Sequence, residues 1–589
     1  TRLVCVYRRR ETGGRATAML RGKNGGSVPS EDSPLVPAKE GGEDDQEPRV
    51  QPKSSSNMLV KIAVFTILSA VLLGVSSTFE LSHKHPKATE ALAVMIVTIM
   101  WFMAEIVPIS IVSLMPLPLY ALLDISSAAE LTGVFFSSSS VILIVGQFLS
   151  LAVVRWGLHQ RLCILVAAAM GQRIETLVLG FMASAWFLSF WISNTATTLS
   201  LLPAAQAFLE TVPREGHGNF HAAFLLAIAF SATAGGIATP VGTPPNAIFM
   251  QQMHDFWPAE EGVSFLMFMA AALPLSLLLL GLLWLGFCVG FVWWKDTPRV
   301  EVDRDLFLRR KAALPKFSYE EQLVLLVALV LITLWFTASP INAFPGWTAH
   351  TAPRMDIGSI GMMCTLPLFI VPCGCALPPA VRRAIGSARC TSSTASEREA
   401  EPPRFLLDWA AVRQKFNFDL LLCLGGANMI GQGTIESGLA AVIAEQLARI
   451  QGPYLGYVAV ILVVTSLTTE FVSNAATMGI LGPVVAASAS NSGRNAVNAL
   501  LGSTFACSFS FALPTASGPN IVVYGTGQVR LLFLMRVGLA VEIGALMLGT
   551  LWVSYAVPLI LGPATADYAA PDIEGINSYL AAIKARVAP

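Results

Sequence analysis

The feature that most constrains this chain is a series of apolar segments of about the length needed to cross a membrane. A spanning α-helix needs about 20 apolar residues. Segment 59–79 has that length, whereas 176–209 is too long for one straight helix and 418–430 is too short. Irregular backbone at membrane depth is tolerated only inside the protein. The mixture therefore predicts an all-α polytopic membrane protein with broken helices and re-entrant hairpins.

The charge content supports this prediction. Only 13% of the residues are charged, whereas an ordinary soluble domain has about 25%. The 38 basic and 38 acidic residues balance, so no basic excess exists to neutralise nucleic-acid phosphates. The sequence contains no HExxH, GxSxG or P-loop motif. These observations argue against a soluble protein, a nucleic-acid binder, an enzyme and an ATP-driven pump.

Composition divides the chain into five predicted parts. They are a disordered polar N-terminal tail at 1–57, a first membrane half at 58–294, a charged linker at 295–321, a second membrane half at 322–561 with a charged insertion at 374–415, and a short C-terminal tail at 562–589. The positive-inside rule places the linker and the insertion in the cytosol. An inverted repeat would instead place the second hairpin's entrance, near the insertion, outside. The side of the insertion stays open.

A duplicated pair of motifs is the most informative feature. Ser-Asn-Thr-Ala-Thr at 193–197 is matched by Ser-Asn-Ala-Ala-Thr at 473–477. Each is followed by a Pro-Asn break, which reads Gly-Thr-Pro-Pro-Asn at 242–246 and Ala-Ser-Gly-Pro-Asn at 516–520. Two matching pairs in the same order indicate an internal duplication, as in many secondary transporters.

The chemistry of these motifs favours a Na⁺ site next to an anion site. Hydroxyl, amide and carbonyl oxygens suit Na⁺, and the starts of broken helices favour anions. The surrounding segments 184–205, 222–253, 471–493 and 495–529 contain no Asp, Glu, Lys or Arg. We therefore hypothesise that bound Na⁺ supplies the positive charge that an anion needs, which would couple the two. Small polar residues can instead serve helix packing, and the duplication argues against that alternative.

Two acidic residues, Glu105 and Glu470, also lie in apolar surroundings. Charged side chains at membrane depth are functional or are paired. For each residue, a functional role and pairing with a helix end both stay open.

The motifs resemble those of the divalent-anion:sodium symporters, the family of the sodium/dicarboxylate, sodium/citrate and sodium/sulfate cotransporters. The resemblance covers roughly 59–561. It rests on Ala-Glu-Ile-Val-Pro at 104–108, Trp-Gly-Leu-His-Gln-Arg at 156–161, Trp-Ile-Ser-Asn-Thr-Ala-Thr-Thr at 191–198, Gly-Gly at 425–426 and Glu-Ser-Gly-Leu at 436–439.

The resemblance implies an inverted-repeat homodimer in which a mobile transport domain moves as an elevator against a scaffold domain. It implies Na⁺ as the coupling ion and no other cofactor. The first sodium site would use Ser189, Ser193, Asn194 and Gly242. The second would use Thr469, Val472, Asn474 and Ala516. The substrate would meet Ser193, Asn194, Thr195, Thr243, Pro244, Ser473, Asn474, Ser517 and Gly518.

Two positions depart from the family pattern on the substrate side. Ala475 stands where the family has the motif's Thr, and Gly518 stands where it has the first proline of Thr-Pro-Pro-Asn. We expect a plasma-membrane symporter that imports succinate, malate or citrate with Na⁺. The alternatives are a sodium/sulfate cotransporter, a sodium-independent dicarboxylate exchanger, and a non-transporting receptor or channel on the same fold.

Overall fold

The computed structural model describes residues 55–104, 106–169, 173–212, 218–257, 263–292, 306–338, 346–348, 355–374, 404–448 and 452–565. Their regular structure is helical, apart from one isolated bridge between Pro372 and Phe405. Seven helices in these ranges are long and apolar enough to cross a membrane. Several predicted parts lie outside the described residues. They are the N-terminal tail up to residue 54, the C-terminal tail from residue 566, much of the linker and of the insertion, and Glu105.

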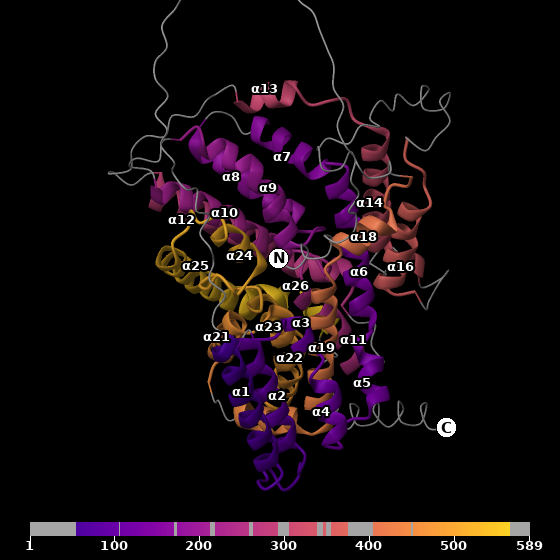
Figure 1. Ribbon diagram of the computed structural model, residues 1–589, viewed down its shortest axis with the longest axis vertical. Helices are drawn as coiled ribbons and strands as arrows, with labels where there is room; N and C mark the ends of the chain where they lie inside the picture. The colour runs from indigo at the N-terminus through magenta and orange to yellow at the C-terminus, as the bar shows by residue number, and fades with distance from the viewer. Residues whose placement is uncertain are drawn as a thin grey trace, which may run out of the picture. The chain divides into compact units, whose positions relative to one another are not determined.

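The helices of the first half are labelled in Figure 1. They are α1 (Ser55–Ser76), α2 (Ala88–Ala104), α3 (Ile109–Val112), α4 (Pro116–Leu122), α5 (Ala128–Phe135), α6 (Ser138–Arg155), α7 (Leu158–Ala169), α8 (Ile174–Leu188), α9 (Asn194–Leu209), α10 (Gly218–Gly236), α11 (Pro244–Phe256) and α12 (Phe265–Phe291).

The remaining helices follow in the same order along the chain. They are α13 (Leu306–Ala312), α14 (Tyr319–Ala338), α16 (Ile357–Thr365), η1 (Leu366–Phe369), α18 (Trp409–Lys415), α19 (Phe418–Glu436), α20 (Leu439–Ala448), α21 (Tyr454–Phe471), α22 (Asn474–Asn491), α23 (Ala496–Ala506), α24 (Gly518–Tyr524), α25 (Leu531–Leu551), η4 (Trp552–Ala556) and α26 (Val557–Thr565).

The predicted duplication extends over whole helices, because α6–α12 correspond in order to α19–α25. The turn after α6 contains Gly157 with φ +75°, and the turn after α19 contains Gly438 with φ +73°. This left-handed backbone is strained for residues with a Cβ, so glycine is used in both turns. The helices that follow the two motifs each contain a proline, Pro203 in α9 and Pro483 in α22.

The two halves contact each other through equivalent amide side chains. Gln147 of α6 donates to the carbonyl oxygen of Asn417 (3.2 Å) and accepts from its N–H (2.7 Å). Asn428 of α19 donates to the hydroxyls of Ser137 (3.0 Å) and Ser139 (3.3 Å). Asn417 and Ser137 are the N-cap residues of α19 and α6. Each half therefore binds the helix start of the other, as two related repeats would.

The apolar core also joins the two halves. One cluster of buried residues contains side chains from α8, α10 and α12 together with side chains from α21, α22 and α23. The rings of Phe230 and Phe511 lie 5.1 Å apart, and those of Phe268 and Phe505 lie 6.3 Å apart. The helices that carry the two motifs are thus held in a shared core.

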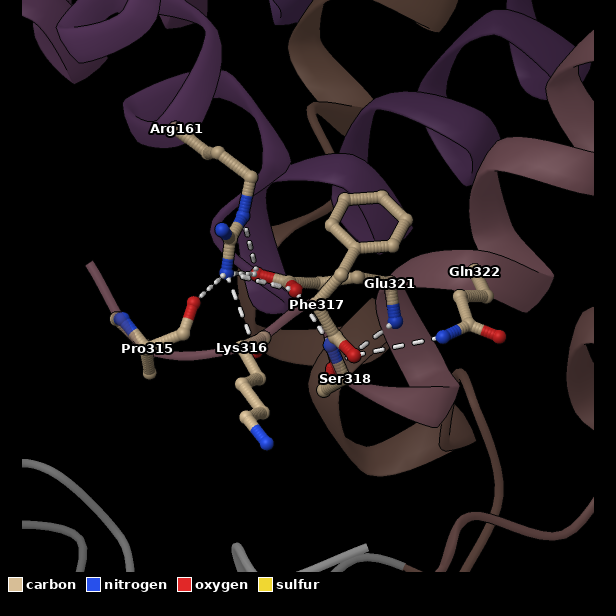
Figure 2. Close-up of polar contacts among 7 residues, drawn as sticks. All are labelled: Arg161, Pro315, Lys316, Phe317, Ser318, Glu321 and Gln322. Carbon is tan, nitrogen blue, oxygen red and sulfur yellow. Dashed lines mark hydrogen bonds and ion pairs between the residues drawn. The ribbon is translucent and has the colours of Figure 1, made fainter. Parts of the chain in front are cut away.

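A largely buried ion pair joins the first turns of α7 to the start of α14 (Figure 2). The Arg161 guanidinium donates to both carboxylate oxygens of Glu321, at 3.0–3.2 Å, and to the carbonyl oxygen of Pro315 at 3.0 Å. Glu321 also accepts from the N–H of Ser318 at 2.7 Å, and Phe317 lies 5.1 Å from the guanidinium. Because the carboxylate is fully paired, this clasp can be buried without an isolated charge.

Candidate functional site

Both duplicated motifs lie where one helix ends and another begins. In the first repeat α8 ends at Leu188 and α9 begins at Asn194, with the Ser193 hydroxyl accepting from the N–H of Ala196 at 3.3 Å. In the second repeat the Ser473 hydroxyl accepts from the N–H of Ala476, also at 3.3 Å. Serine is a preferred N-cap because its hydroxyl replaces a missing helical acceptor. The serines therefore start the two helices.

The Pro-Asn motifs end a second pair of breaks. Break 1 is residues 237–243, between α10 and α11, and break 2 is residues 507–517, between α23 and α24. The N-cap residues Thr243 and Ser517 have nearly the same backbone angles, with φ −148° and −141° and ψ 149° in both. Proline follows in the first turn, where a missing N–H does no harm.

The asparagine side chains of these motifs donate hydrogen bonds to main-chain carbonyl oxygens at or within the breaks. The Asn246 amide donates to the carbonyl oxygens of Gly236 (3.0 Å), Ile237 (3.2 Å) and Thr239 (2.7 Å). The Asn520 amide donates to those of Ser510 (3.2 Å) and Leu513 (3.0 Å), at the corresponding chain separations. The sequence revealed these asparagines as a repeat, but their role as internal clamps became visible only in the structure.

Three of the four residues predicted for the first sodium site converge. The Asn194 side chain lies against Gly236, and a Cβ at Gly242 would lie 2.5 Å from the Gly236 carbonyl oxygen and 3.0 Å from that of Ser189. The Ser189 hydroxyl and the Asn194 Oδ1 atom are buried without a hydrogen-bond partner. Unsatisfied buried oxygens are unfavourable unless something binds them. This donor set fits Na⁺, whereas the fourth residue, Ser193, uses its hydroxyl as the N-cap.

The second predicted sodium site is partly assembled. The Thr469 hydroxyl lies 2.8 Å from Asn474 Oδ1 and 3.0 Å from the carbonyl oxygen of Cys507 in break 2. Val472 is the residue after α21, and Ala516 directly precedes the N-cap of α24. Both are buried. The structure thus joins Thr469 and Asn474 directly to break 2, and it places Val472 and Ala516 at the adjoining helix ends.

Two of the predicted substrate residues, Thr195 and Gly518, meet across the two repeats. Thr195 is exposed, and its hydroxyl lies directly against Gly518, so that a Cβ at position 518 would collide with it. The glycine at 518 is therefore the residue that lets α24 approach Thr195. The residues Ser193, Asn194, Pro244, Ser473 and Asn474 are partly buried, and Thr243 and Ser517 are buried. The Ser517 hydroxyl has no partner.

A second cross-repeat contact was not predicted. Gln252 of α11 donates to the carbonyl oxygen of Met478 in α22 at 3.3 Å, and its side chain fills the space beside Gly482. Gly482 precedes Pro483, which interrupts the helical hydrogen bonding there. The glycine and proline together were the sequence signal for a close approach. The contact joins α11 to α22, as Thr195 and Gly518 join α9 to α24.

Glu470 pairs with the main chain of break 2. Its carboxylate accepts from the N–H groups of Ala512 (2.9 Å) and Leu513 (2.8 Å). The sequence left open a functional role or pairing with a helix end; Glu470 instead pairs with main-chain donors inside break 2, between α23 and α24. The four ion pairs in the described part of the chain lie elsewhere. Uncharged oxygens and the positive ends of α9, α11 and α22 dominate the site.

Known proteins match most of the length of this chain. A family model described as "Sodium:sulfate symporter transmembrane region" matches residues 55–561. The sodium-dependent dicarboxylate transporter SdcS of Staphylococcus saprophyticus is 27% identical over 494 residues, which cover 82% of this chain and 89% of that protein. The Na⁺/dicarboxylate cotransporter 3 of Mus musculus is 27% identical, with 79% and 87% covered. The Na⁺/citrate cotransporter of Rattus norvegicus is 26% identical, with 76% and 87% covered.

Proposed function

Because this chain belongs to the sodium:sulfate symporter family, we propose that it is a sodium-coupled symporter that imports small dicarboxylates or tricarboxylates such as succinate, malate and citrate. Membership in this transporter family and the seven apolar helices make it a multi-pass integral membrane protein, and not an enzyme. The substrate class follows the relatives, which are named as dicarboxylate and citrate transporters.

The observation that carries the proposal is the group of unpartnered oxygens at the first motif. Ser189 Oγ and Asn194 Oδ1 are buried beside two main-chain carbonyls, in a segment without fixed charge. An anion beside these oxygens alone would be poorly stabilised. When Na⁺ is bound to these oxygens, the site carries a net positive charge that can stabilise an anion beside it. Anion affinity then depends on Na⁺, and by thermodynamic linkage Na⁺ affinity depends equally on the anion.

An elevator motion is the part of the proposal that concerns mechanism. The contact of Thr195 with Gly518 joins α9 to α24, and the contact of Gln252 with Met478 joins α11 to α22. Both contacts run between the two repeats. Helices joined in this way move as one rigid body. The site between them could therefore cross the membrane while its residues keep their mutual contacts. We propose that this body is the transport domain, that the protein is a homodimer, and that it resides in the plasma membrane. Disulfide trapping of paired cysteines on α9 and α14 in two states would test the motion.

Sulfate is the second candidate substrate, because the matching family is described by it. The substrate-side departures at Ala475 and Gly518 bear on this choice. Ala475 is buried in the core, so the second motif offers one hydroxyl less than the first. A smaller donor set favours an anion that brings two separated carboxylates to the two motifs over one compact tetrahedral anion.

Purified protein in proteoliposomes, with labelled succinate, citrate and sulfate and with Na⁺ or choline outside, tests the proposal. We expect saturable succinate or citrate uptake in Na⁺ only. Uptake of sulfate alone would change the substrate class. Uptake in choline that needs internal dicarboxylate would indicate an exchanger. A failure of all three anions to enter saturably would indicate a receptor or channel.

A further inference from the structure

Each repeat contains a buried polar tie between the helix that precedes its Ser-Asn motif, α8 or α21, and its last long helix, α12 or α25. In the first repeat the Trp186 indole N–H of α8 donates to the Ser276 hydroxyl of α12 at 2.7 Å. Ser276 in turn donates to the carbonyl oxygen of Ala234 in α10 at 2.6 Å. Every group in this tie is neutral, and every donor has one acceptor.

The second repeat builds the same tie from different residues. Ser466 of α21 replaces Trp186, since each lies eight residues before its motif asparagine. Glu542 of α25 replaces Ser276, since each lies eleven residues after the first residue of its helix. Ser466 Oγ lies 2.5 Å from Glu542 Oε1 and 2.9 Å from the carbonyl oxygen of Phe509 in break 2. The second repeat thus has a carboxyl group where the first has a hydroxyl.

Glu542 reaches break 2 by a second route. Its side chain also hydrogen-bonds to that of Glu470, whose two oxygens hold the N–H groups of Ala512 and Leu513. Gly538 lies one turn before Glu542, and a Cβ there would collide with the main chain of Phe511. The face of α25 that carries Glu542 therefore lies directly on break 2.

The donors and acceptors in this cluster require a proton on one carboxyl group. A serine hydroxyl has one hydrogen, and a carbonyl oxygen and an ionised carboxylate can only accept. The single Ser466 hydrogen is shared between the Phe509 carbonyl oxygen and Glu542 Oε1, so the hydrogen bond between Glu542 and Glu470 must take its hydrogen from one of the two carboxyl groups. Glu542 and Glu470 are 3% and 5% exposed, and neither takes part in an ion pair among the described residues. One proton shared between Glu542 and Glu470 avoids two adjacent buried charges.

We propose that Glu542 is a positioning residue for the second sodium site. It holds Ser466 and Glu470 on α21 and, through them, both ends of the segment 509–513 of break 2. That segment includes Ser510, whose hydroxyl lies 3.5 Å from Asn474 Oδ1. Loosening the segment moves oxygens of the sodium site without removing a ligand. This inference rests on the proposed sodium-coupled function.

The test compares Na⁺ binding to purified full-length variants by thermal unfolding in detergent, at increasing NaCl with choline chloride holding ionic strength constant. The variants are Glu542→Gln, which keeps a neutral side chain that can donate, and Glu542→Leu, which cannot. Glu445→Leu on the exposed face of α20 is the control for the same change away from the site. The readout is the Na⁺ concentration that gives half of the stabilisation, which a merely structural role would leave unchanged.

We expect Glu542→Leu to raise that concentration about tenfold, as the loss of one charge-assisted hydrogen bond would. Glu542→Gln and Glu445→Leu should stay within about twofold of the wild type, well inside the variation of one weak contact. An unchanged Na⁺ midpoint in Glu542→Leu, even with a lower melting temperature, would overturn the inference. If Na⁺ fails to stabilise the wild type more than choline does, the proposed sodium-coupled function fails first.

Discussion

A methyl group placed at Gly242 should damage the first sodium site without changing any polar side chain. The Cβ of Gly242→Ala would lie 2.5 Å from the Gly236 carbonyl oxygen, and 3.0 Å from both the Gly236 Cα and the Ser189 carbonyl oxygen. These are main-chain atoms that cannot rotate away, so the breaks must shift. Overpacking of this kind costs about 1–3 kcal/mol. If that cost falls on the ion-bound state, the Na⁺ concentration for half-maximal uptake rises about 5- to 150-fold.

The assay is substrate uptake into proteoliposomes as a function of external Na⁺. Gly281→Ala in α12 is the matched control, because a Cβ at that position meets nothing within 4 Å. It should leave the Na⁺ dependence unchanged and help to show that an added methyl group is harmless in itself. A wild-type Na⁺ dependence in Gly242→Ala would refute the placement of the first sodium site beside this glycine.

Two further predictions concern the breaks and the contact between repeats, and both are measured by thermal unfolding in detergent. Asn246→Leu and Asn520→Leu each remove an amide whose two hydrogens bind main-chain carbonyl oxygens of a break, so at about 1 kcal/mol per hydrogen each should be destabilising by about 2 kcal/mol; wild-type stability in either variant would contradict the clamp role. Gly518→Ala should be destabilising because its methyl group meets the Thr195 hydroxyl, and adding Thr195→Ala should restore stability. A double variant no more stable than Gly518→Ala would show that this collision is not the cause.

The repeat and its breaks could be predicted because membrane burial makes polar residues conspicuous. Ser-Asn and Pro-Asn within apolar segments are unfavourable unless they serve a site or a break, and their duplication excluded coincidence. The helix starts at Asn194 and Asn474 follow from the serine caps before them. A serine N-cap can be recognised from its neighbours in the sequence alone, so these helix starts could be predicted without knowing the contacts with distant parts of the chain.

The contacts that complete the site could not be predicted, because they join residues far apart in the sequence. Gln252 and Glu542 carry no motif, and their partners lie on other helices. Glu470 was conspicuous, yet only the structure shows that its carboxylate holds break 2. Gly518 reads as a departure from the family pattern until Thr195 is seen against it.

The central claim is that anion and Na⁺ movement depend on each other, and paired flux measurements test it most directly. Labelled Na⁺ and labelled succinate are followed into the same proteoliposomes, each with and without the other solute. We predict that succinate enters only with Na⁺, that succinate accelerates Na⁺ entry, and that Asn194→Ala abolishes both effects. Succinate entry at the same rate in choline, or Na⁺ entry that ignores succinate, would contradict the account.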